Sequence, residues 1–450
     1  MDNDPAFEFG MTRSDLQTLI EEALAQAAAA GAGQAEAAAS LGTGLSVMVR
    51  RGEVETLEYQ RDRGFSLTVF FGPKKGSAST SDLTPQAIRE TVVKACSIAR
   101  FTAEDPLSGL ADPELMPDQV PDLDLDHPWP LSPDEAIRIA AECEAAGLDF
   151  DPRITNSEGG TLNSHRGLRV YGNSHGFTGG YSSSSHGVSC VLVAAGEDGS
   201  MERDYWYTAS RDPAKLDPVP DVGRRAGERA VARLGARRLG TRDAPVLFPA
   251  DLARGLIGHF VSAIRGTAQY RRASFLLDAV GQQVFPQGLR IDERPHIPAA
   301  MASVPFDSEG VATRDRALVA DGKLESYVLS SYSARRLGLK STGNAGGIHN
   351  LIVAPGAGGL PELMAEMDTG FLVNELIGHG VNTVTGDYSR GAAGFWVEDG
   401  EIQYPVSEVT IAGNLKTMLA GIARVGDDID TRGAVRTGSI LIEAMKIAGD

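Results

Sequence analysis

The stretch from Gly370 to Asn414 constrains the fold of this chain more than any other. Its sequence is GFLVNELIGHGVNTVTGDYSRGAAGFWVEDGEIQYPVSEVTIAGN, in which short runs of β-branched and aromatic residues alternate with glycines. Such runs are typical of strands that are joined by tight turns. The stretch therefore predicts a region whose order comes from strand pairing and not from packed helices.

The size and charge of the chain limit its architecture and its partners. With 450 residues it is too long for one ordinary core, since domains usually contain about 100–200 residues. Hydrophobic residues make up 42%, which is enough to bury substantial cores. The formal net charge of −18 argues against nucleic acid as a partner, because such binding needs clustered Lys and Arg side chains.

The cysteine pattern and the N-terminus predict a cytoplasmic protein. The cysteines are far apart and form no CxxC pair: Cys96, Cys143 and Cys190. This spacing predicts neither a disulfide framework nor a cysteine zinc site. The N-terminus carries acidic residues where a secretory signal needs positive charge: Asp2, Asp4 and Glu8. The alanine-rich stretch Ala23–Ala39 is broken by glycines and a glutamate, so we expect no membrane span.

The first half of the chain predicts a mixture of helices and antiparallel strands. Met11–Ala30 predicts a helix, followed by a Gly/Ala linker, and strands are expected from Gly44 onward. Thr84-Pro85 predicts a helix start, because a capping hydroxyl is followed by proline in the first turn. The fold class predicted is α+β, in which this helix-and-sheet region precedes a C-terminal region that is mostly β.

These patterns divide the chain into four segments. We expect an N-terminal α+β domain at 1–104, a Pro- and Asp-rich connector at 105–131, a middle α+β region at 132–240, and a C-terminal β-rich domain at 241–450. A helix predicted over Val222–Leu239 carries arginines four residues apart: Arg225, Arg229, Arg233 and Arg237. This row predicts a solvated basic face or, alternatively, a docking face for an acidic partner.

The run Gly386–Trp396, GDYSRGAAGFW, is too particular for a generic loop. Together with Arg203–Tyr207, Ser274–Leu277 and Val284–Pro286, it closely resembles the PmbA/TldE branch of the TldD/PmbA family, also known as modulator of gyrase or peptidase U62. The resemblance implies that a chain like this one pairs with a TldD-type catalytic subunit to form a zinc metallopeptidase. Such heterodimers cut unstructured peptides, and only the TldD branch carries the zinc motif. The resemblance also implies a β-rich, barrel-like C-terminal domain after the N-terminal α+β region.

The zinc motif of the TldD branch is His-Glu-x-x-x-His, at the start of the last domain. The matching positions in this chain are Arg254, Gly255 and His259, in a helix predicted from about Ala250 to Arg265. Arginine does not give up its proton to become a metal ligand, and glycine has no carboxylate to serve as general base. The TldD branch also uses a cysteine near its C-terminus, and this chain has no cysteine after Cys190. The resemblance therefore implies no catalytic or metal residue here, no cofactor in this chain, zinc in the partner, and an inactive isolated chain.

A similar sequence occurs later, where Asn374-Glu375-Leu376-Ile377-Gly378-His379 resembles the motif with asparagine in place of one histidine. Its place inside the β-rich stretch argues against a helical zinc site. We expect residues of this stretch to form a peptide channel instead, with these candidates: Asn374, His379, Asp387, Tyr388 and Arg390. An extended peptide would gain main-chain hydrogen bonds there by adding as a strand.

Two other functions remain open from the sequence. The chain is a stand-alone metallopeptidase if His259, His379 and a carboxylate such as Glu375 form an atypical site, and tightly bound stoichiometric zinc would favour that reading. It is a non-enzymatic, peptide-binding homodimer if it self-associates and has no affinity for a TldD-type chain.

Overall fold

The computed structural model describes residues 10–449. The acidic N-terminal residues on which the prediction about a secretory signal rests lie outside this range. The first half of the chain forms one long antiparallel sheet with the strand order β3-β2-β1-β4-β5-β6. Its strands are β1 Gln34–Arg50, β2 Glu53–Phe71, β3 Lys74–Thr80, β4 Ile154–Asn173, β5 Thr178–Ala195 and β6 Met201–Ser210.

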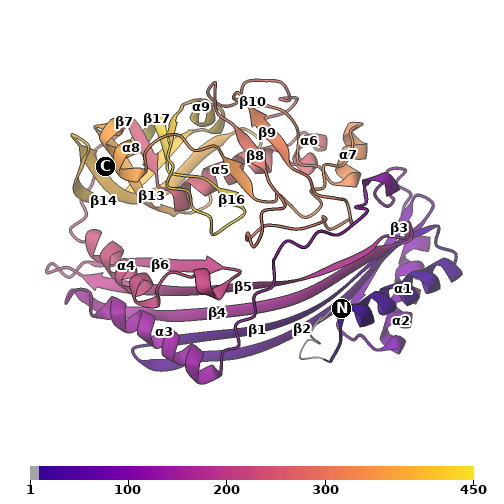
Figure 1. Ribbon diagram of the computed structural model, residues 1–450. Helices are drawn as coiled ribbons and strands as arrows, with labels where there is room; N and C mark the ends of the chain where they lie inside the picture. Colours follow the sequence, from indigo (N-terminus) through magenta and orange to yellow (C-terminus); the bar gives the residue numbers. More distant parts are fainter. Residues whose placement is uncertain (1–9, 450) are drawn as a thin grey trace.

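Four helices pack on this sheet in two pairs. At one end lie α1 Arg13–Ala29 and α2 Pro85–Phe101, and at the other lie α3 Pro133–Leu148 and α4 Val219–Ala232 (Figure 1). The helix starts follow from local chemistry, because the hydroxyl of Thr84 accepts from Ala87 N at the start of α2, and Ser132 caps α3 with Glu135 in a capping box. The predicted start at Thr84-Pro85 is confirmed.

The predicted Gly/Ala linker before Gly44 is wrong, because β1 already begins at Gln34. Alanine has a low strand propensity, but the alternate residues Ala35, Ala37 and Ala39 are buried between the sheet and the first helix pair. They belong to the same core as Leu16 and Ile20 of α1. Small side chains let the helices approach the sheet closely, so tertiary packing outweighs local propensity here.

The segment between α2 and α3 is irregular apart from a short 3₁₀ turn at Pro113–Leu115. It crosses from the first helix pair to the second (Figure 1). The N-terminal and middle regions therefore contribute strands to one common sheet, three on each side of the β1–β4 pairing. The division of the chain into four segments stays a prediction.

The C-terminal half contains a barrel-like sheet formed by β7 Arg242–Phe248, β12 Gly370–Ile377, β13 Asp387–Glu398, β14 Glu401–Asn414 and β17 Ile440–Ala448. The order β14-β13-β12-β7-β17 closes on itself, because Thr410–Ala412 of β14 also pairs with Lys446–Ala448 of β17. The predicted α+β class with a barrel-like C-terminal domain is confirmed. The β-rich prediction for Gly370–Asn414 is also correct, since β12, β13 and β14 occupy most of it.

The turns of this stretch show why its glycines are needed. Asp399 and Gly400 both have positive φ, 51° and 73°, at the hairpin between β13 and β14. Gly394 sits beside the shift in strand register, where an added Cβ would collide with the carbonyl oxygen of Leu372. Glycine at these points permits the tight hairpin and the close approach of β12 and β13.

A second sheet and several helices complete the C-terminal half. The sheet has the order β10-β9-β8-β11-β16, formed by Lys323–Leu324, Arg316–Ala320, Ile291–Glu293, Leu351–Val353 and Val435–Arg436. The helices are α5 Ala250–Ile264, α6 Gly266–Tyr270, α7 Ser331–Leu337, α8 Leu360–Met367 and α9 Leu415–Ala420, and β15 Ile422–Val425 pairs with β17. Of these helices the sequence predicted only α5. None of the helices within residues 10–449 has the length and apolar character that crossing a membrane requires.

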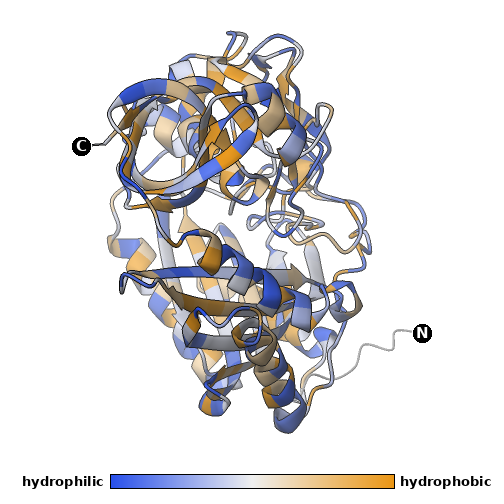
Figure 2. Cartoon of the chain, turned by 90° about the vertical axis from the view of Figure 1, so that its left-hand side faces the viewer, coloured by the Kyte–Doolittle hydropathy of each residue, from blue (hydrophilic) through white to orange (hydrophobic). Residues whose placement is uncertain are grey.

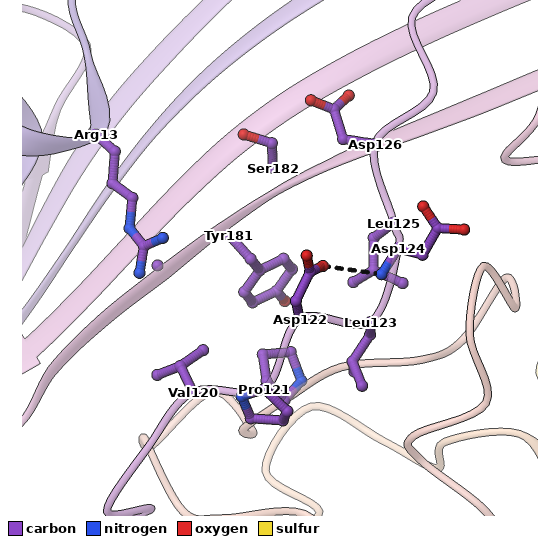
Figure 3. A pocket seen from close by; sticks show the side chains of 12 residues that line it. Arg13, Val120, Pro121, Asp122, Leu123, Asp124, Leu125, Asp126, Tyr181 and Ser182 are labelled. Carbon is purple, nitrogen blue, oxygen red and sulfur yellow. Dashed lines mark hydrogen bonds between the residues drawn. The ribbon is translucent and has the colours of Figure 1, made fainter. Parts of the chain in front are cut away.

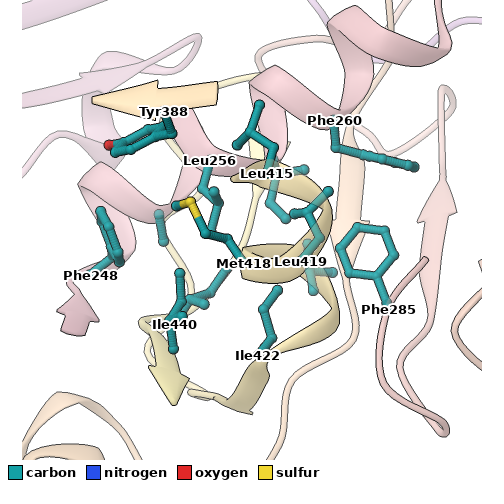
Figure 4. Packing of buried hydrophobic residues seen from close by; sticks show 14 of the residues in the cluster. Phe248, Leu256, Phe260, Phe285, Tyr388, Leu415, Met418, Leu419, Ile422 and Ile440 are labelled. Atoms are coloured by element: carbon teal, nitrogen blue, oxygen red, sulfur yellow. The ribbon is translucent and has the colours of Figure 1, made fainter. Parts of the chain in front are cut away.

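Hydrophobic packing fixes the orientation of α5. Leu256 and Phe260 point into a core with Leu415 and Met418 from the α9 segment (Figure 4). Hydrophobic segments alternate with hydrophilic ones along the strands and helices of both halves (Figure 2). With one face of α5 held in the core, its opposite face, which carries Arg254 and Gly255, is turned away from the core toward the rest of the chain.

Candidate functional site

A cavity of about 260 Å³ lies where the long sheet meets the C-terminal half. We call it the α5 cavity. Its lining comes from β6, the end of α4, the start of α5, and β12 and β13: Arg203, Asp204, Tyr205, Arg233, Asp251, Leu252, Arg254, Gly255, Asn374, Glu375, Leu376 and Arg390. Two positions compared with the zinc motif, Arg254 and Gly255, therefore lie in the same cavity as two predicted channel residues, Asn374 and Arg390.

Asp204 lines the α5 cavity and binds several of its polar neighbours. Its side chain is only 3% exposed. Its Oδ1 accepts from Arg229 Nε at 3.0 Å, and its Oδ2 accepts from Asn374 Nδ2 at 2.6 Å. Arg233 lies 3.6 Å from the same carboxylate. Because a buried carboxylate needs opposite charges and donors, this set holds β6, α4 and β12 in fixed positions.

The arginine row was predicted to be a solvated basic face or, alternatively, a docking face for an acidic partner, and the first prediction is wrong for Arg229 and Arg233. Arg233, 11% exposed, pairs with Glu202 at 3.2 Å and with Glu375 at 2.7 Å. Arg225 lies over the Trp206 ring with its Cζ 4.0 Å from the centroid, and Arg237 lies over Tyr404 at 4.9 Å. The helix α4 ends at Ala232, so the row does not continue along one helix. Arg229 and Arg233 therefore meet carboxylates of their own chain, whereas Arg225 and Arg237 are exposed and contact aromatic rings.

A second arginine, Arg432, approaches the same carboxylate as Arg254, that of Asp430. Arg432 binds Asp430 through two bonds of 2.9 and 3.0 Å, and it lies over the Tyr207 ring at 4.2 Å. Although burial opposes it, the bond from Arg432 lowers the pKa of Asp430. Arg254 reaches the same carboxylate only at 3.7 Å. Asp430 is thus already engaged, and Arg254 is held loosely at the cavity wall.

His259 lies one turn further along α5. Its ring meets the ring of Tyr388 edge-on, with centroids 6.0 Å apart. Burial and the nearby Arg390 charge lower the pKa of His259, which favours the neutral imidazole. Burial raises the pKa of Tyr388 to about 12. This environment is that of a packed aromatic pair.

Comparisons with known proteins indicate the same family for all three parts of the chain that family models match. Models of the PmbA/TldA metallopeptidase family match domain 1 at residues 35–99, the central domain at 126–234 and the C-terminal domain at 241–449. The metalloprotease PmbA of Escherichia coli O157:H7 is 53% identical over 90% of each chain. The PmbA homologue of Haemophilus influenzae is 49% identical over 91% of this chain and 90% of its own. The chain belongs to the PmbA/TldD metallopeptidase family.

Solved structures support the PmbA/TldD fold. A putative modulator of DNA gyrase from Bacteroides thetaiotaomicron has a TM-score of 0.92 and 27% identity, covering 98% of this chain and 100% of its own. TldE from Thermococcus kodakarensis has a TM-score of 0.84 and 21% identity, covering 96% and 100%, and shows the shared fold. The predicted membership of the PmbA/TldE branch is confirmed.

The family is named for metallopeptidase activity, so the fit of zinc to this PmbA-type chain can be tested from its side chains. At the α5 positions, Arg254 is a permanent cation beside a second arginine, Gly255 offers no ligand or base, and His259 packs on Tyr388. A catalytic zinc site typically needs three protein ligands. Within residues 10–449 no three His, Cys, Asp or Glu side chains gather as a metal-binding group. The residues present do not fit a zinc ion.

The predicted channel residues divide into two groups. Asn374 and Arg390 line the α5 cavity. Tyr388 is 3% exposed and lies in the core. Asp387 accepts from the Thr385 hydroxyl at 2.6 Å, and exposed His379 follows the end of β12 in a loop. The sequence Asn374–His379 therefore runs along a strand into a loop, and not along a helix as the zinc motif does.

The sequence reasoning missed the contributions of β6, α4 and Asp251 to the cavity. The run Arg203–Tyr207 was noticed for its resemblance, but nothing in its local pattern predicts contact with β12, which lies about 170 residues later. The one available signal was the arginine row, because closely spaced like charges need acidic neighbours. Asp204, Glu202 and Glu375 are those neighbours.

A larger cavity, of about 350 Å³, lies under the connector (Figure 3). Asp122 and Asp124 point along its rim, where Asp122 Oδ1 accepts from the backbone of Asp124 at 3.0 Å. Asp126 is paired with Arg166 at 2.7 Å. The pair of Asp126 with Arg166 of β4 holds the connector against the sheet, and this cavity shares no lining residue with the α5 cavity.

Proposed function

We propose that this chain is the PmbA/TldE-type subunit of a heterodimeric zinc metallopeptidase that acts on unstructured peptides. A TldD-type partner supplies zinc, the general base and the attacking water, and this chain shapes the cleavage chamber. The isolated chain is inactive. The observation that carries the proposal is the pair Arg254 and Gly255 on the cavity face of α5, where a metallopeptidase would need an imidazole and a carboxylate.

The net charge of the chain supports peptides, and not nucleic acid, as its ligands. A net charge of −18 disfavours nucleic acid, and unstructured peptides do not require a basic surface. We place the heterodimer in the cytoplasm, because the three cysteines follow no disulfide or zinc spacing.

We further propose that the β12 region guides extended peptides. β12 pairs with β13 along most of its length, but with β7 only at Phe371 and Leu372. The carbonyls of Asn374 and Leu376 accept bonds from Arg229 at 3.3 Å and Arg390 at 3.1 Å. A peptide that adds as a strand beside this part of β12 would exchange those two side-chain bonds for main-chain bonds.

The first experiment measures zinc content and peptide cleavage for the purified chain, for the TldD-type partner, and for their mixture. We expect no stoichiometric zinc and no cleavage with this chain alone, and chelator-sensitive cleavage in the mixture. Zinc at one per chain, with activity lost on changing His259 or His379, would instead establish a stand-alone metallopeptidase. Self-association with no affinity for the partner would establish a non-enzymatic homodimer.

The guiding role of β12 is tested in the mixture. Leu376→Pro removes one backbone donor from the strand, and proline is tolerated best on strands with a free edge. We expect lower cleavage with retained heterodimer formation. Unchanged cleavage by a correctly assembled Leu376→Pro heterodimer would contradict the role of this stretch.

A further inference from the structure

The charges that line the α5 cavity are not all balanced within the chain. Arg233 is paired with Glu202 and Glu375 at 3.2 and 2.7 Å, and Arg203 is paired with Glu158 at 2.8 Å. These two guanidinium groups therefore have carboxylate partners of their own. The other two arginines of the lining are Arg254 and Arg390.

Arg390 forms no ion pair with any carboxylate of residues 10–449. Its Nη2 donates to the carbonyl oxygen of Leu376 at 3.1 Å. Its Nε is buried and has no hydrogen-bond partner among the described residues. A buried donor without a partner costs free energy, so a small shift of the Arg390 side chain that brings Nε to a ligand oxygen would be stabilised.

Arg254 is the second arginine of the lining whose charge is not fully balanced by a carboxylate. Its closest carboxylate, Asp430 at 3.7 Å, is already bound by both bonds of Arg432. The Arg254 side chain remains 33% exposed. Asp251, one turn earlier on α5, also lines the cavity, but it forms no ion pair with Arg254 or Arg390 within the described part of the chain.

The surface of α5 beside Arg254 and Arg390 carries glycine, and therefore no side chain, at positions 255 and 258. A Cβ built on Gly255 or on Gly258 has no atom within 4 Å, so packing within the chain does not require glycine at either position. Glycine in a helix costs about 1 kcal/mol relative to alanine. A bare helix surface beside two cations leaves room for the backbone of a bound chain to approach α5.

From these observations we propose that the α5 cavity binds a peptide carboxylate, held by the guanidinium groups of Arg254 and Arg390. The planar donors of arginine match the two oxygens of a carboxylate. Asp251 and Glu375 on the same lining repel a doubly charged phosphate more strongly than a singly charged carboxylate. The carboxylate is either the C-terminus of the peptide or an Asp or Glu side chain within it.

The test uses the isolated full-length chain and three fluorescent peptides of Gly, Ser and Ala, with binding followed by fluorescence anisotropy. One peptide has a free C-terminus, one has an amidated C-terminus and an internal glutamate, and one is amidated and has no acidic residue. We expect one or both of the first two to bind, and the neutral peptide not to bind. Which of the two binds more tightly identifies the source of the carboxylate.

Substitutions that are expected to weaken peptide binding, to strengthen it or to leave it unchanged test whether the α5 cavity is the binding site. Arg254→Gln and Arg390→Gln each weaken binding by about tenfold or more, as expected for the loss of a charge-assisted bond. Asp251→Asn strengthens it, because a repulsive charge is removed. Arg424→Gln changes the net charge equally at a remote exposed pair with Glu366, and it leaves binding unchanged.

Gly255→Leu serves as a variant that keeps every charge. A Cβ at this position meets no atom within 4 Å, so the leucine side chain starts in open space and extends over the cavity wall. We expect weaker peptide binding at an equal or higher melting temperature, because leucine has a higher helix propensity than glycine. Equal binding of the neutral peptide, equal loss with Arg424→Gln, or stronger competition by inorganic phosphate than by acetate would overturn the proposal. None of these outcomes depends on a catalytic partner, so the proposed subunit role is tested separately.

Discussion

Asn374 Nδ2 donates to Asp204 Oδ2 at 2.6 Å, which joins the edge of β12 to strand β6 of the long sheet. The two residues are separated by 170 positions in the chain. Asp204 also accepts from Arg229 of α4 and receives the backbone N–H of Tyr205 at 2.7 Å. One buried carboxylate therefore links the two halves of the molecule at the wall of the α5 cavity.

Removal of this carboxylate should be strongly destabilising. Asp204→Ala leaves Arg229 without its ion pair in a buried site, and breaking one partner of a buried pair typically costs about 3–5 kcal/mol. Urea unfolding followed by circular dichroism measures the change. Glu408→Ala is the matched control, because its pair with Arg238 is 70% and 64% exposed and such pairs are worth about 0–1 kcal/mol. Equal effects of the two substitutions would contradict the role of Asp204.

Two helical glycines should respond to alanine in opposite directions. A Cβ at Gly255 of α5 meets nothing within 4 Å, so Gly255→Ala should stabilise the chain by up to about 1 kcal/mol through helix propensity. A Cβ at Gly223 of α4 would collide with the carbonyl oxygen of Cys143 in α3, so Gly223→Ala should destabilise it. Thermal unfolding of both variants gives the signs. A loss of stability with Gly255→Ala would mean that α5 packs differently from the arrangement described.

The fold could be predicted where local chemistry decides the outcome. Thr84 and Ser132 cap helices, and the Asp399-Gly400 hairpin follows from residues that tolerate positive φ. The start of β1 could not be predicted, because Ala35, Ala37 and Ala39 form a strand only through their fit under α1 and α2. The helices α7 and α8 were missed because each has fewer than ten residues and carries little periodicity.

Four histidines should make the chain less stable in mild acid. Loss of contact with water, nearly complete for some and partial for others, lowers the pKa of each: His186, His259, His296 and His349. An unfolded histidine has a pKa near 6.5, so below about pH 6.5 the unfolded state binds more protons than the folded state. The stability from these groups is complete above that pH and is lost as the pH falls through their lower folded values.

The slope of the unfolding free energy against pH checks this prediction. Each histidine that differs in protonation contributes up to about 1.4 kcal/mol per pH unit. His349, which is 8% exposed and bonded through Nε2 to the carbonyl of Gly343 at 3.2 Å, is the clearest single case. His349→Gln should reduce the slope between pH 7 and pH 5.5. A slope equal to that of the wild type would show that this imidazole does not contribute.

The site was predicted only in part, and the reason is geometric. Arg254, Gly255, Asn374 and Arg390 were named from sequence, and all four line one cavity. The sequence could not show that Asp204 and Arg233 lie opposite them, since those contacts depend on how the long sheet packs against the barrel-like sheet. It also could not show that Tyr388 is buried in the core while Arg390, two residues later on the same face of β13, lines the cavity.

Substitutions of His259 can distinguish a packing role of its ring from a role as a metal ligand. Its ring contacts Tyr388 edge-on at 6.0 Å, and phenylalanine can keep that contact but cannot bind a metal. We therefore expect His259→Phe to leave cleavage by the mixture with a TldD-type partner unchanged. His259→Ala serves as the comparison and should lower the melting temperature. Cleavage lost with His259→Phe at normal assembly would assign the imidazole a direct role.

Restoring the side chains of the zinc motif should not restore a zinc site. The double variant Arg254→His/Gly255→Glu introduces an imidazole and a carboxylate on α5, which is a continuous helix from Ala250 to Ile264. Residues five apart on a regular helix point roughly 140° apart, so positions 254 and 259 do not face one metal ion. His259 is also held against Tyr388, and a third ligand is missing.

We expect the double variant to hold no stoichiometric zinc after dialysis and to cleave no peptide alone. Arg254→Gln/Gly255→Ala is its control, since it changes the same positions without adding ligands. Elemental analysis and a peptide-cleavage assay give the result. One zinc per chain with cleavage in the double variant alone would mean that α5 bends to bring positions 254 and 259 together, and that only two side chains separate this subunit from an enzyme.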